Sequence, residues 1–435
     1  MTQGEALRIL RTGANVFLTG EPGSGKTHTV NRYVEWLREH GIEHAITAST
    51  GIAATHIKGM TIHSWSGIGI AEYLTPELVD KVASKEHVVR RIEKAKVLII
   101  DEVSMLSAEV LSMVDAVAKE VRRNDRAFGG LQVVLVGDFF QLPPVSKGEP
   151  SFAFESPVWK ELNPIVCYLS EQFRQDDPQF LEVLAAIRAG VYDPSHVSIL
   201  LSRESDEADE DVPRLYTHNE DVDRINDEKL ASLPGKTHIH AMKTQGPTVM
   251  VEALKRGCLS PETLALKEGA SVMATKNNPI GGYVNGTLGT VIGFEKGTDY
   301  PIVETKEGKT LTIAPQDWVV EDGGKIKARL TQIPLRLAWA ITVHKSQGMS
   351  MDAAAIDLSR AFEYGQGYVA LSRVRCLAGL CLLGWSEEAL AMHPLVTQKD
   401  KEFRKQAREA QAVFEQLEET GEREELEKNF LKAVR

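Results

Sequence analysis

The stretch Gly20-Glu-Pro-Gly-Ser-Gly-Lys-Thr27 decides the fold of this 435-residue chain. It follows a short apolar run, Asn15-Val-Phe-Leu-Thr-Gly20, and it opens a helical pattern over residues 25–40. Glycines allow backbone N–H groups to close around phosphate oxygens, and a helix N-terminus adds positive potential. A complete phosphate-loop pattern between a strand and a helix therefore predicts a nucleoside triphosphate site rather than a glycine-rich turn without a ligand.

Each polar residue of this loop has a predicted task. Lys26 is expected to reach the β- and γ-phosphates, and the Thr27 hydroxyl is expected to bind Mg²⁺. Gly23, Ser24 and Gly25 would contact the nucleotide through the loop backbone. ATP and Mg²⁺ are therefore the expected ligands.

The first third of the chain alternates strand and helix signals around this loop. Buried strands are predicted at residues 45–49, 97–100 and 131–137. Apolar residues at spacings of three and four predict a helix over residues 106–121. Strands that alternate with helices imply a parallel sheet covered on both faces, so the predicted fold class is α/β.

Two of these strands end in polar residues that suit phosphoryl transfer. The strand at 97–100 would deliver Asp101 to the metal, and Glu102 can activate the attacking water. A helix-capping pair is the alternative, which the preceding apolar strand and phosphate loop disfavour. The run Val136-Gly-Asp-Phe-Phe-Gln-Leu-Pro-Pro144 places Gln141 where a γ-phosphate sensor would lie, although a turn that only satisfies backbone groups is also open.

A second α/β unit is expected to begin near residue 166. Asp177-Pro178 reads as a helix start, and Gly190 reads as its stop. Arginines supplied from another domain can stabilise the charge that builds during phosphoryl transfer, at about 10³–10⁵ in rate. Arg174 and Arg373 are the candidates at expected sheet edges, although surface arginines are usually solvated or paired with acids.

Three segments depart from the α/β pattern. Residues 66–92 are polar and mostly helical, and they interrupt the succession of sheet strands. Residues 284–335 combine short alternating segments with turn glycines, which predicts a small antiparallel barrel before α/β signals return near residue 336. The last segment carries apolar residues at helical spacing, so we expect a helix packed on the body rather than a coiled coil.

Composition limits the class of protein. The chain is long enough for two to four domains, and 43% hydrophobic with 26% charged residues is ordinary for a globular protein. No apolar run is long enough for a membrane span, and no basic-then-apolar leader opens the sequence, so a cytoplasmic location is expected. Four scattered cysteines indicate neither a zinc site nor disulfides. A net charge of −11 argues weakly against nucleic acid, but binding depends on the local groove.

In this order the motifs resemble a superfamily-one helicase of the 5′→3′ subfamily, and more narrowly a PIF (petite integration frequency) helicase. The most specific match is residues 114–144. The resemblance covers about residues 3–385 and implies two RecA-like parallel-sheet domains with a helical wedge and an SH3-like β-barrel insertion. The implied domains are 1A (1–65 and 93–165), wedge 1B (66–92), 2A (166–283 and 336–395), SH3-like 2B (284–335) and a helical tail (396–435).

The resemblance also implies roles for individual residues. Gln3 matches the adenine-reading glutamine, and Arg174 and Arg373 become the two γ-phosphate arginines. Arg375 stands close enough to Arg373 to be confused with it. These assignments come from the family and not from the spacing of the residues.

Predicted DNA contacts lie after strands of both units. Small hydroxyl residues and exposed backbone N–H groups suit phosphate contacts, which position a strand without reading its sequence. Isolated residues of this kind more often cap helices or bond within the core, and it is the order of motifs that favours DNA. The expected contacts are Thr47, Ser49, Thr50, Gly51, His63, Ser64, His218, Asn219, Asn285, His344, Lys345 and Ser346. Gln347 and Gly348 are also expected to couple to the nucleotide, and Trp65, Phe139 and Phe140 are candidates for base stacking or for core packing.

The expected activity is ATP-driven movement on single-stranded DNA with unwinding at single-strand/duplex junctions. The family implies the 5′→3′ direction, and it implies G-quadruplexes and RNA–DNA hybrids as further substrates. Three alternatives stay open: a translocase that remodels protein–DNA complexes, a phosphate-loop ATPase switch that does not act on DNA, and an RNA-directed helicase. We expect a monomer that does not associate with membranes.

Overall fold

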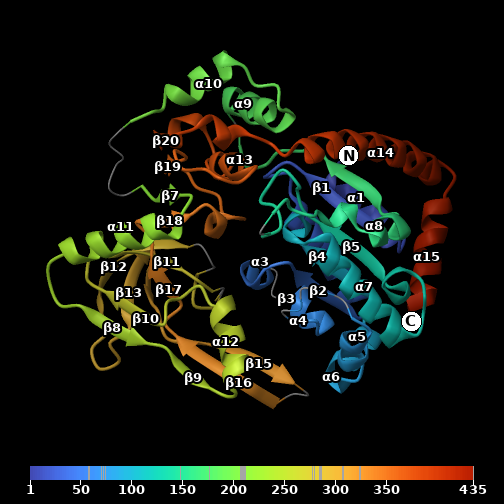
Figure 1. Cartoon of the computed structure of the whole chain (residues 1–435), viewed down its shortest axis with the longest axis horizontal. Coiled ribbons are helices and arrows are strands. Elements are labelled where there is room, and N and C mark those ends of the chain that lie inside the picture. The colour runs from blue at the N-terminus through green and yellow to red at the C-terminus, as the bar shows by residue number, and fades with distance from the viewer. Residues whose placement is uncertain are drawn as a thin grey trace. The chain divides into compact units, whose positions relative to one another are not determined.

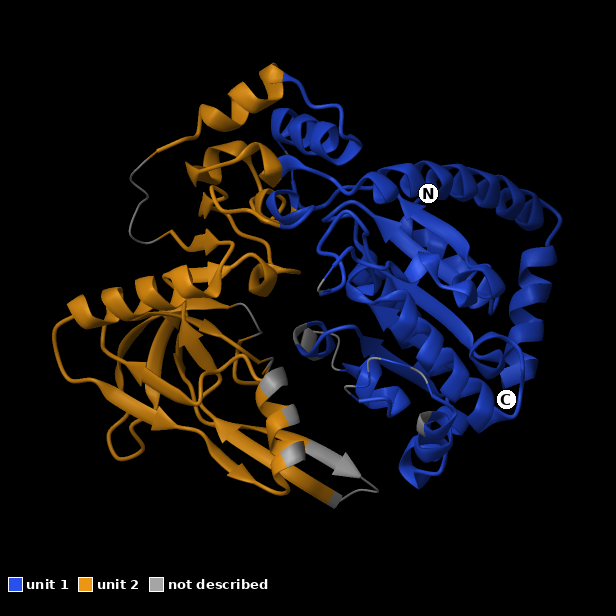
Figure 2. Ribbon diagram, in the orientation of Figure 1, with its two compact units in different colours: residues 1–193, 363–368, 390–435 blue, residues 194–362, 369–389 orange. Residues whose placement is uncertain are grey.

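The computed structural model describes residues 1–56, 59–69, 71, 73, 75–146, 148–175, 177–205, 212–276, 278, 280–283, 287–305, 308–322 and 325–434. The chain forms two compact units, coloured separately in Figure 2. The first unit comprises Met1–Asp193, Glu363–Tyr368 and Leu390–Arg435, and the second comprises Pro194–Phe362 and Val369–Ala389. Each unit contains a parallel sheet, so the predicted α/β fold class is confirmed.

The sheet of the first unit is parallel throughout, with the strand order β3-β2-β4-β5-β1-β6 (Figure 1). Its strands are β1 (Val16–Gly20), β2 (His44–Ala48), β3 (Met60–Thr61), β4 (Val97–Asp101), β5 (Gln132–Val136) and β6 (Ile165–Leu169). Strands β1 and β5 are buried along their whole length, as apolar strands of a sheet covered on both faces are. The four strands predicted around the phosphate loop are confirmed as β1, β2, β4 and β5.

Several helices belong to the first unit. They are α1 (Gln3–Arg11), α2 (Lys26–Glu39), α3 (Gly51–His56), α4 (Ile62–Ser66), α5 (Pro76–Ala83), α6 (Glu86–Lys94), α7 (Ala108–Arg122), α8 (Pro157–Leu162), α9 (Pro178–Ala189), α14 (Pro394–Glu419) and α15 (Glu422–Val434). Apolar residues of α1 and α2 share one core with β1, β4 and β5. Helix α9 has the predicted ends, because the Asp177 carboxylate accepts the N–H groups of Gln179 and Phe180, and Gly190 adopts a φ of 66°.

The C-terminal helices α14 and α15 pack on the first unit, as the sequence predicts. Phe403 of α14 is buried against Phe17 of β1, with ring centroids 5.0 Å apart. Phe430 and Leu431 of α15 pack against the core that α1 and α2 share. In Figure 1 both helices are drawn along the side of the unit that carries α1 and α8.

The second unit joins a parallel sheet to antiparallel ones. Its helices are α10 (Pro194–Leu201), α11 (Asn219–Ser232) and α12 (Thr248–Gly257), and α13 (Gln366–Leu371) crosses the boundary between the units. Its parallel sheet has the order β18-β7-β19-β20, from β18 (Ala340–Thr342), β7 (Arg214–Tyr216), β19 (Ala354–Asp357) and β20 (Leu380–Gly384). Its antiparallel strands are β8 (His238–Ala241), β9 (Lys243–Gln245), β10 (Thr263–Leu266), β11 (Ser271–Ala274), β12 (Leu288–Phe294), β13 (Pro301–Thr305), β14 (Thr310–Thr312), β15 (Gln316–Asp322), β16 (Lys325–Gln332) and β17 (Leu335–Leu337).

The observed boundaries differ from the expected ones in two places. The first unit continues past residue 166 to Asp193, because β6 pairs with β1 along its whole length and so belongs to the first sheet. The antiparallel region begins at β8, well before residue 284, because β8 pairs with β10 and β11 pairs with β12 and β17. Within residues 66–92 the structure describes α5 and α6. Among the described residues no helix combines the length and the apolar character needed to cross a bilayer.

Candidate active site

The phosphate loop lies between β1 and α2. Gly23 and Gly25 adopt φ angles of 88° and 86°, in the left-handed region that disfavours side chains. A Cβ atom at Gly25 would meet the Gln3 side-chain nitrogen at 2.0 Å. Helix α2 then begins at Lys26 without a side-chain cap, so its first N–H groups face no competing side-chain acceptor. This geometry suits an anion bound by backbone.

Lys26 is held in place by the loop itself. Its ammonium donates to the carbonyl oxygens of Gly20 and Glu21, at 2.8 and 3.0 Å. Burial lowers the pKa of Lys26 to about 8, although the negative charges of Asp138 and Glu102 oppose that shift. Two backbone carbonyls are weak partners for a cation at such a site, so a phosphate is a fitting replacement.

The candidate Mg²⁺ ligands come from the phosphate loop and from the end of strand β4. Thr27 follows Lys26 and is exposed, and Asp101 ends β4. The Asp101 carboxylate accepts the Glu102 N–H at 2.9 Å, and burial raises the pKa of Asp101 to about 6 despite the nearby Lys26 charge. Ser24 is buried, and its hydroxyl finds no hydrogen-bond partner in the part of the chain that the structure describes. A hydroxyl and a carboxylate are oxygen ligands of the kind that Mg²⁺ takes.

Glu102 stands at a strained backbone position. Its φ and ψ angles are 51° and 45°, which is the left-handed region, and the residue is not glycine. Such a conformation costs on the order of 1–3 kcal/mol and persists only where the surroundings enforce it. The Glu102 carboxylate lies near enough to Lys26 and Arg174 to influence the pKa of each. The strained backbone conformation therefore goes together with a carboxylate placed beside the cations Lys26 and Arg174.

The turn after β5 carries Gln141, which is 7% exposed. The Gln141 N–H donates to the Asp138 carbonyl at 2.9 Å, and its side-chain nitrogen lies 3.5 Å from the Asp138 carboxylate. Burial alone would raise the pKa of Asp138, but the Arg188 guanidinium at 2.7 Å reverses the shift and holds it below the ordinary value. Asp138 is thus an ionised anchor for the turn.

The segment after β6 lies directly on the phosphate loop. The Gln172 side chain donates to Pro22 O at 2.9 Å, and the Phe173 N–H donates to Gly23 O at 3.0 Å. Arg174, expected in the second unit, therefore lies in the first, because β6 pairs with β1 and its chain leaves the sheet beside the loop. Burial lowers the pKa of Arg174, and the Glu102 charge opposes the shift.

Gln3 is brought to the same loop from α1. Its side-chain nitrogen donates to Ser24 O at 3.3 Å, and its N–H donates to the Glu171 carboxylate at 2.8 Å. Phe173 is a residue that the sequence reasoning missed: its ring is 64% exposed although its backbone is fixed to Gly23. The available signal was an aromatic residue directly before the predicted Arg174.

In the second unit the predicted residues gather at the carboxyl ends of β7 and β18. These strands are parallel neighbours, so the residues that follow them meet at one sheet edge. The Lys345 ammonium donates to the Asn219 side-chain oxygen at 2.9 Å. Burial lowers the pKa of Lys345 to about 8, and the Arg336 charge adds to the shift. His218 caps the start of α11 beside Asn219, and its ring lies 4.9 Å from that of Phe362.

Arg373 is turned toward its own unit. The side chain is 1% exposed, and it donates to Val369 O at 2.9 Å and to the Ser372 hydroxyl at 3.0 Å. Gln347 is 9% exposed, whereas Gly348 is exposed with a φ of 79°. The structure therefore places Arg373 in a backbone-bonded position within the second unit.

Several expected DNA contacts are structural side chains. Thr47 is fully buried and donates to Ile99 O at 2.7 Å, and Ser346 is fully buried and donates to Val343 O at 2.7 Å. Each of these two hydroxyls bonds a backbone carbonyl inside the core, and their contact with DNA stays a prediction. The aromatic rings proposed for base stacking, Trp65, Phe139 and Phe140, are also buried in the core.

The other expected DNA contacts differ in how exposed they are to solvent. Thr50 accepts the Ala53 N–H at the start of α3, which Gly51 opens, and Ser49 is 7% exposed. The exposed Ser64 donates its N–H to Thr61, and burial lowers the pKa of the half-buried His63. His344 is half-buried, and Asn285 lies outside the described residues. All of the expected DNA contacts remain predictions.

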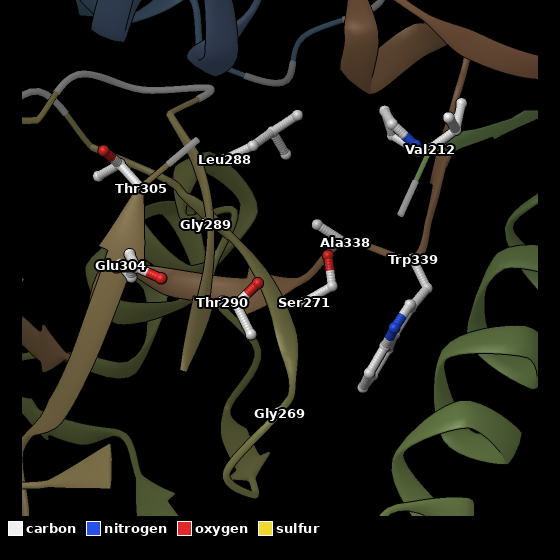
Figure 3. Close-up of a pocket in the computed structure, with 11 residues that line it drawn as sticks. Val212, Gly269, Ser271, Leu288, Gly289, Thr290, Glu304, Thr305, Ala338 and Trp339 are labelled. Atoms are coloured by element: carbon white, nitrogen blue, oxygen red, sulfur yellow. The ribbon is translucent and has the colours of Figure 1, made fainter. Parts of the chain in front are cut away.

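A cavity of about 320 Å³ in the second unit lies apart from these residues (Figure 3). Ser271, Thr290, Glu304 and Trp339 are among its lining residues. Figure 3 shows the Trp339 ring beside the β11–β12 strands. None of the predicted site residues that the structure describes contributes to this lining.

Two family models match the chain. A model described as PIF1-like helicase matches residues 6–193, and one described as DNA helicase Pif1, 2B domain, matches residues 250–294. The chain is 44% identical to an ATP-dependent DNA helicase Pif1 from Psychrobacter sp., over 96% of this chain and 73% of the relative. It is 38% identical to an ATP-dependent DNA helicase PIF1 of Xenopus laevis, over 91% of this chain but 63% of that relative's length.

Solved structures give the same result. The fold matches the crystal structure of Pif1 helicase from Candida albicans with a TM-score of 0.80 and 35% identity, over 92% of this chain and 98% of that chain. It also matches Pif1 helicase from Bacteroides in complex with ADP-AlF3 and ssDNA, with a TM-score of 0.70 and 30% identity, over 93% of this chain and 96% of that chain.

Proposed function

We propose that this chain, which belongs to the PIF1-like helicase family and is an ATP-hydrolysing DNA helicase by that membership, moves 5′→3′ on single-stranded DNA and unwinds duplexes at junctions. One observation carries the proposal: beside the phosphate loop, Glu102 lies close enough to both Lys26 and Arg174 for its charge to raise the pKa of each against the effect of burial. Two cations and one carboxylate at a strand-to-helix phosphate loop are the groups that nucleotide hydrolysis requires.

The loop residues divide the binding of ATP among them. Lys26 exchanges its two carbonyl partners for β- and γ-phosphate oxygens, and the backbone of Gly23, Ser24 and Gly25 surrounds them. Thr27 and Asp101 hold Mg²⁺, which supplies charge neutralisation on the phosphates when it is bound.

Glu102 is the general base in this proposal. Its carboxylate lies beside the loop cations Lys26 and Arg174, where it can accept a proton from the attacking water. Gln141 orients that water from its turn, and Arg174 stabilises the charge on the γ-phosphoryl group. Arg373 is the second arginine, supplied by the other unit, and Gln347 with Gly348 couples the nucleotide to the DNA-binding edge.

The adenine base has two candidate contacts. The Gln3 amide, fixed to Ser24 O, has the donor and acceptor that a base edge needs. The exposed Phe173 ring, anchored through its N–H to Gly23 O, offers a stacking face next to the loop. Gln3 would therefore select the base and Phe173 would hold its plane.

DNA is held through phosphate and sugar contacts. His218, Asn219, His344 and Lys345 follow neighbouring parallel strands, and Lys345 is already fixed by Asn219. The exposed face of Ser64, with Thr50 and Gly51, is the matching candidate in the first unit. Contacts of this kind position a strand without reading its sequence, which suits a translocating protein with a net charge of −11.

Residues 66–92 are the proposed wedge, and the antiparallel region of the second unit is the proposed SH3-like insertion. We also propose G-quadruplexes and RNA–DNA hybrids as substrates and a monomer as the working form. The resemblance to the family supports these assignments.

The test is unwinding of duplexes that carry either a 5′ or a 3′ single-stranded tail. We expect ATP-dependent strand separation with the 5′ tail and about background separation with the 3′ tail, and no activity in Lys26→Ala. Displacement of a bound protein from single-stranded DNA without strand separation would instead identify a remodelling translocase. Equal activity on RNA tracks would identify an RNA-directed enzyme.

A further inference from the structure

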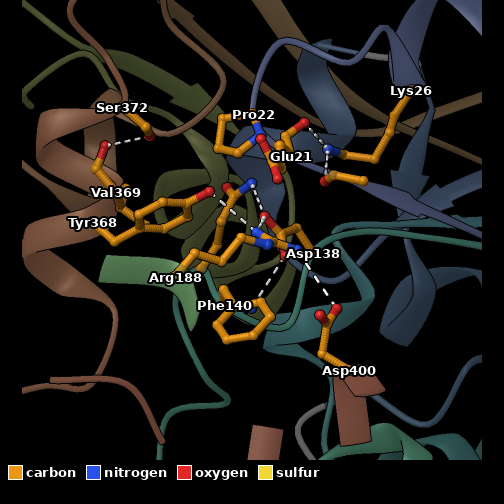
Figure 4. A network of polar contacts seen from close by, with 12 residues as sticks. Glu21, Pro22, Lys26, Asp138, Phe140, Arg188, Tyr368, Val369, Ser372 and Asp400 are labelled. Atoms are coloured by element: carbon orange, nitrogen blue, oxygen red, sulfur yellow. Dashed lines mark hydrogen bonds and ion pairs between the residues drawn. The ribbon is translucent and has the colours of Figure 1, made fainter. Parts of the chain in front are cut away.

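A buried cluster centred on Arg188 lies next to the candidate active site (Figure 4). Arg188, on α9, is 2% exposed and donates to the Asp138 carboxylate at 2.7 Å. It also donates to the Tyr368 hydroxyl at 3.1 Å and to the Tyr168 hydroxyl at 3.0 Å. Its guanidinium lies over the Phe140 ring, 4.2 Å from the centroid. The guanidinium is thus fixed on several sides.

The cluster is connected to the turn that carries Gln141. Asp138 accepts from Arg188, and the same residue accepts the Gln141 N–H through its carbonyl oxygen. Phe140, which Arg188 covers, precedes Gln141 in the chain. A shift of Arg188 therefore moves both residues that set the direction of the Gln141 side chain.

Helix α14 contributes an acid to this cluster. The Tyr168 hydroxyl accepts from Arg188 and donates to the Asp400 carboxylate at 3.1 Å, so it bridges the two. Asp400 also lies 3.9 Å from Arg188. Its other oxygen accepts from Arg404 at 2.7 Å, and Arg404 lies 3.8 Å from the Glu21 carboxylate of the phosphate loop. Asp400 is therefore tied both to the Gln141 turn and to the loop.

The charge balance around Arg188 explains why Asp400 matters for the position of Asp138. Arg188 carries one positive charge in a buried place, and Asp138, its acid partner at 2.7 Å, also lies near enough to Lys26 to influence the pKa of that lysine. Asp400 adds negative charge 3.9 Å from Arg188 and gives the Tyr168 hydroxyl an acceptor. Without it, Arg188 would compete more strongly for the Asp138 carboxylate that also faces Gln141.

We propose that Asp400 of the C-terminal helix is a positioning residue of the ATP site, acting through Tyr168 and Arg188 on Asp138 and on the turn that carries Gln141. It contacts no substrate. The inference rests on the proposed function, because it assigns Asp400 to the hydrolytic step through Gln141.

The experiment compares Tyr168→Phe and Asp400→Asn with wild type and with the control Glu409→Gln. Tyr168→Phe removes only the bridging hydroxyl, and Glu409 is an exposed acid of α14 whose ion-pair partner is Lys405, outside the cluster. The full-length chain is assayed for kcat and KM of ATP hydrolysis with saturating oligo(dT), for binding of a fluorescent ADP analogue, and for Tm.

We expect kcat to fall about three- to tenfold in Tyr168→Phe and in Asp400→Asn and to stay unchanged in the control Glu409→Gln. In all of these variants KM and ADP binding should change less than about twofold, and Tm should stay near wild type. The double variant Tyr168→Phe/Asp400→Asn is expected to have the kcat of the single variant with the lower kcat. The two losses should not multiply, since both substitutions break one chain of contacts. Asp400→Glu, which keeps the charge, should recover part of kcat.

Two results would overturn the inference: kcat values equal to that of Glu409→Gln, or losses of kcat that follow a lowered Tm and are not recovered by Asp400→Glu. A wild-type protein without DNA-stimulated ATP hydrolysis would instead reject the proposed function. The two failures are therefore separable in one data set.

Discussion

The phosphate loop of the first unit and the segment that follows α13 in the second unit hold their predicted arginines in different ways. Arg174 lies beside the loop with Glu102 and Lys26 as electrostatic neighbours. Arg373 is buried and bonded to Val369 O and Ser372 within its own unit. In the first unit the candidate residues therefore already lie together, whereas under the proposed function Arg373 would have to exchange its present partners for phosphate.

The largest expected effect separates the two arginines. Arg174→Ala should lower DNA-stimulated kcat about 10³-fold, and Arg373→Ala should do the same, because each removes an arginine that stabilises charge on the γ-phosphoryl group. The slow hydrolysis without DNA should fall in Arg174→Ala but stay near wild type in Arg373→Ala. Steady-state hydrolysis with and without oligo(dT) measures both.

The exposed Arg408 of α14 gives the control, since Arg408→Ala should leave both rates unchanged. Equal loss of the DNA-independent rate in the two variants would contradict the division between the units.

The next largest effect is expected from substituting Glu102, the residue with strained backbone angles in the first unit. Glu102→Gln should lower kcat about 10²–10³-fold, because the amide cannot accept the proton of the attacking water, while ATP binding persists. Equilibrium binding of a fluorescent ATP analogue beside single-turnover hydrolysis separates the two steps. Loss of binding equal to the loss of rate would show that Glu102 supports the loop rather than the chemistry.

A smaller effect tests the sheet edge of the second unit. Lys345→Ala should weaken binding of single-stranded DNA about tenfold at low salt and reduce the salt dependence by about one counterion, because it removes one phosphate contact. Fluorescence anisotropy across a salt series gives both quantities. Thr47→Val is the matched control, since the buried Thr47 hydroxyl bonds Ile99 O. A lower DNA affinity in Thr47→Val would show that the Thr47 hydroxyl contacts DNA.

The smallest effect concerns pH. The pKa of Asp101 is raised to about 6, so the carboxylate is ionised above that pH and takes up a proton below it. Mg²⁺ competes with this proton, and the Mg²⁺ concentration for half-maximal hydrolysis should rise about three- to fivefold from pH 7.5 to 5.5. Magnesium titrations at the two pH values measure it, with Asp101→Asn as the variant that loses the pH dependence. A requirement for Mg²⁺ that does not change with pH would exclude Asp101 as a ligand.

The sequence predicted the strands that carry the candidate residues of the first unit because local patterns determine them. A glycine-rich loop after an apolar strand fixes Lys26, and an apolar strand before Asp101 fixes the acidic pair. The sequence did not reveal that Thr47 and Ser346 are buried, because a hydroxyl residue after a strand has the same sequence pattern whether it points to solvent or bonds a backbone carbonyl. Arg174 was assigned to the wrong unit because the pairing of β6 with β1 joins residues far apart in the chain. The Arg188–Asp400 link has no sequence signal for the same reason.

The rate of ATP hydrolysis with and without single-stranded DNA is the most direct test of the account. Wild-type protein should hydrolyse ATP many times faster with oligo(dT) than without it, and Lys26→Ala should be inactive in both conditions. A rate that single-stranded DNA leaves unchanged would contradict the motor, even if the phosphate loop proved to bind ATP tightly.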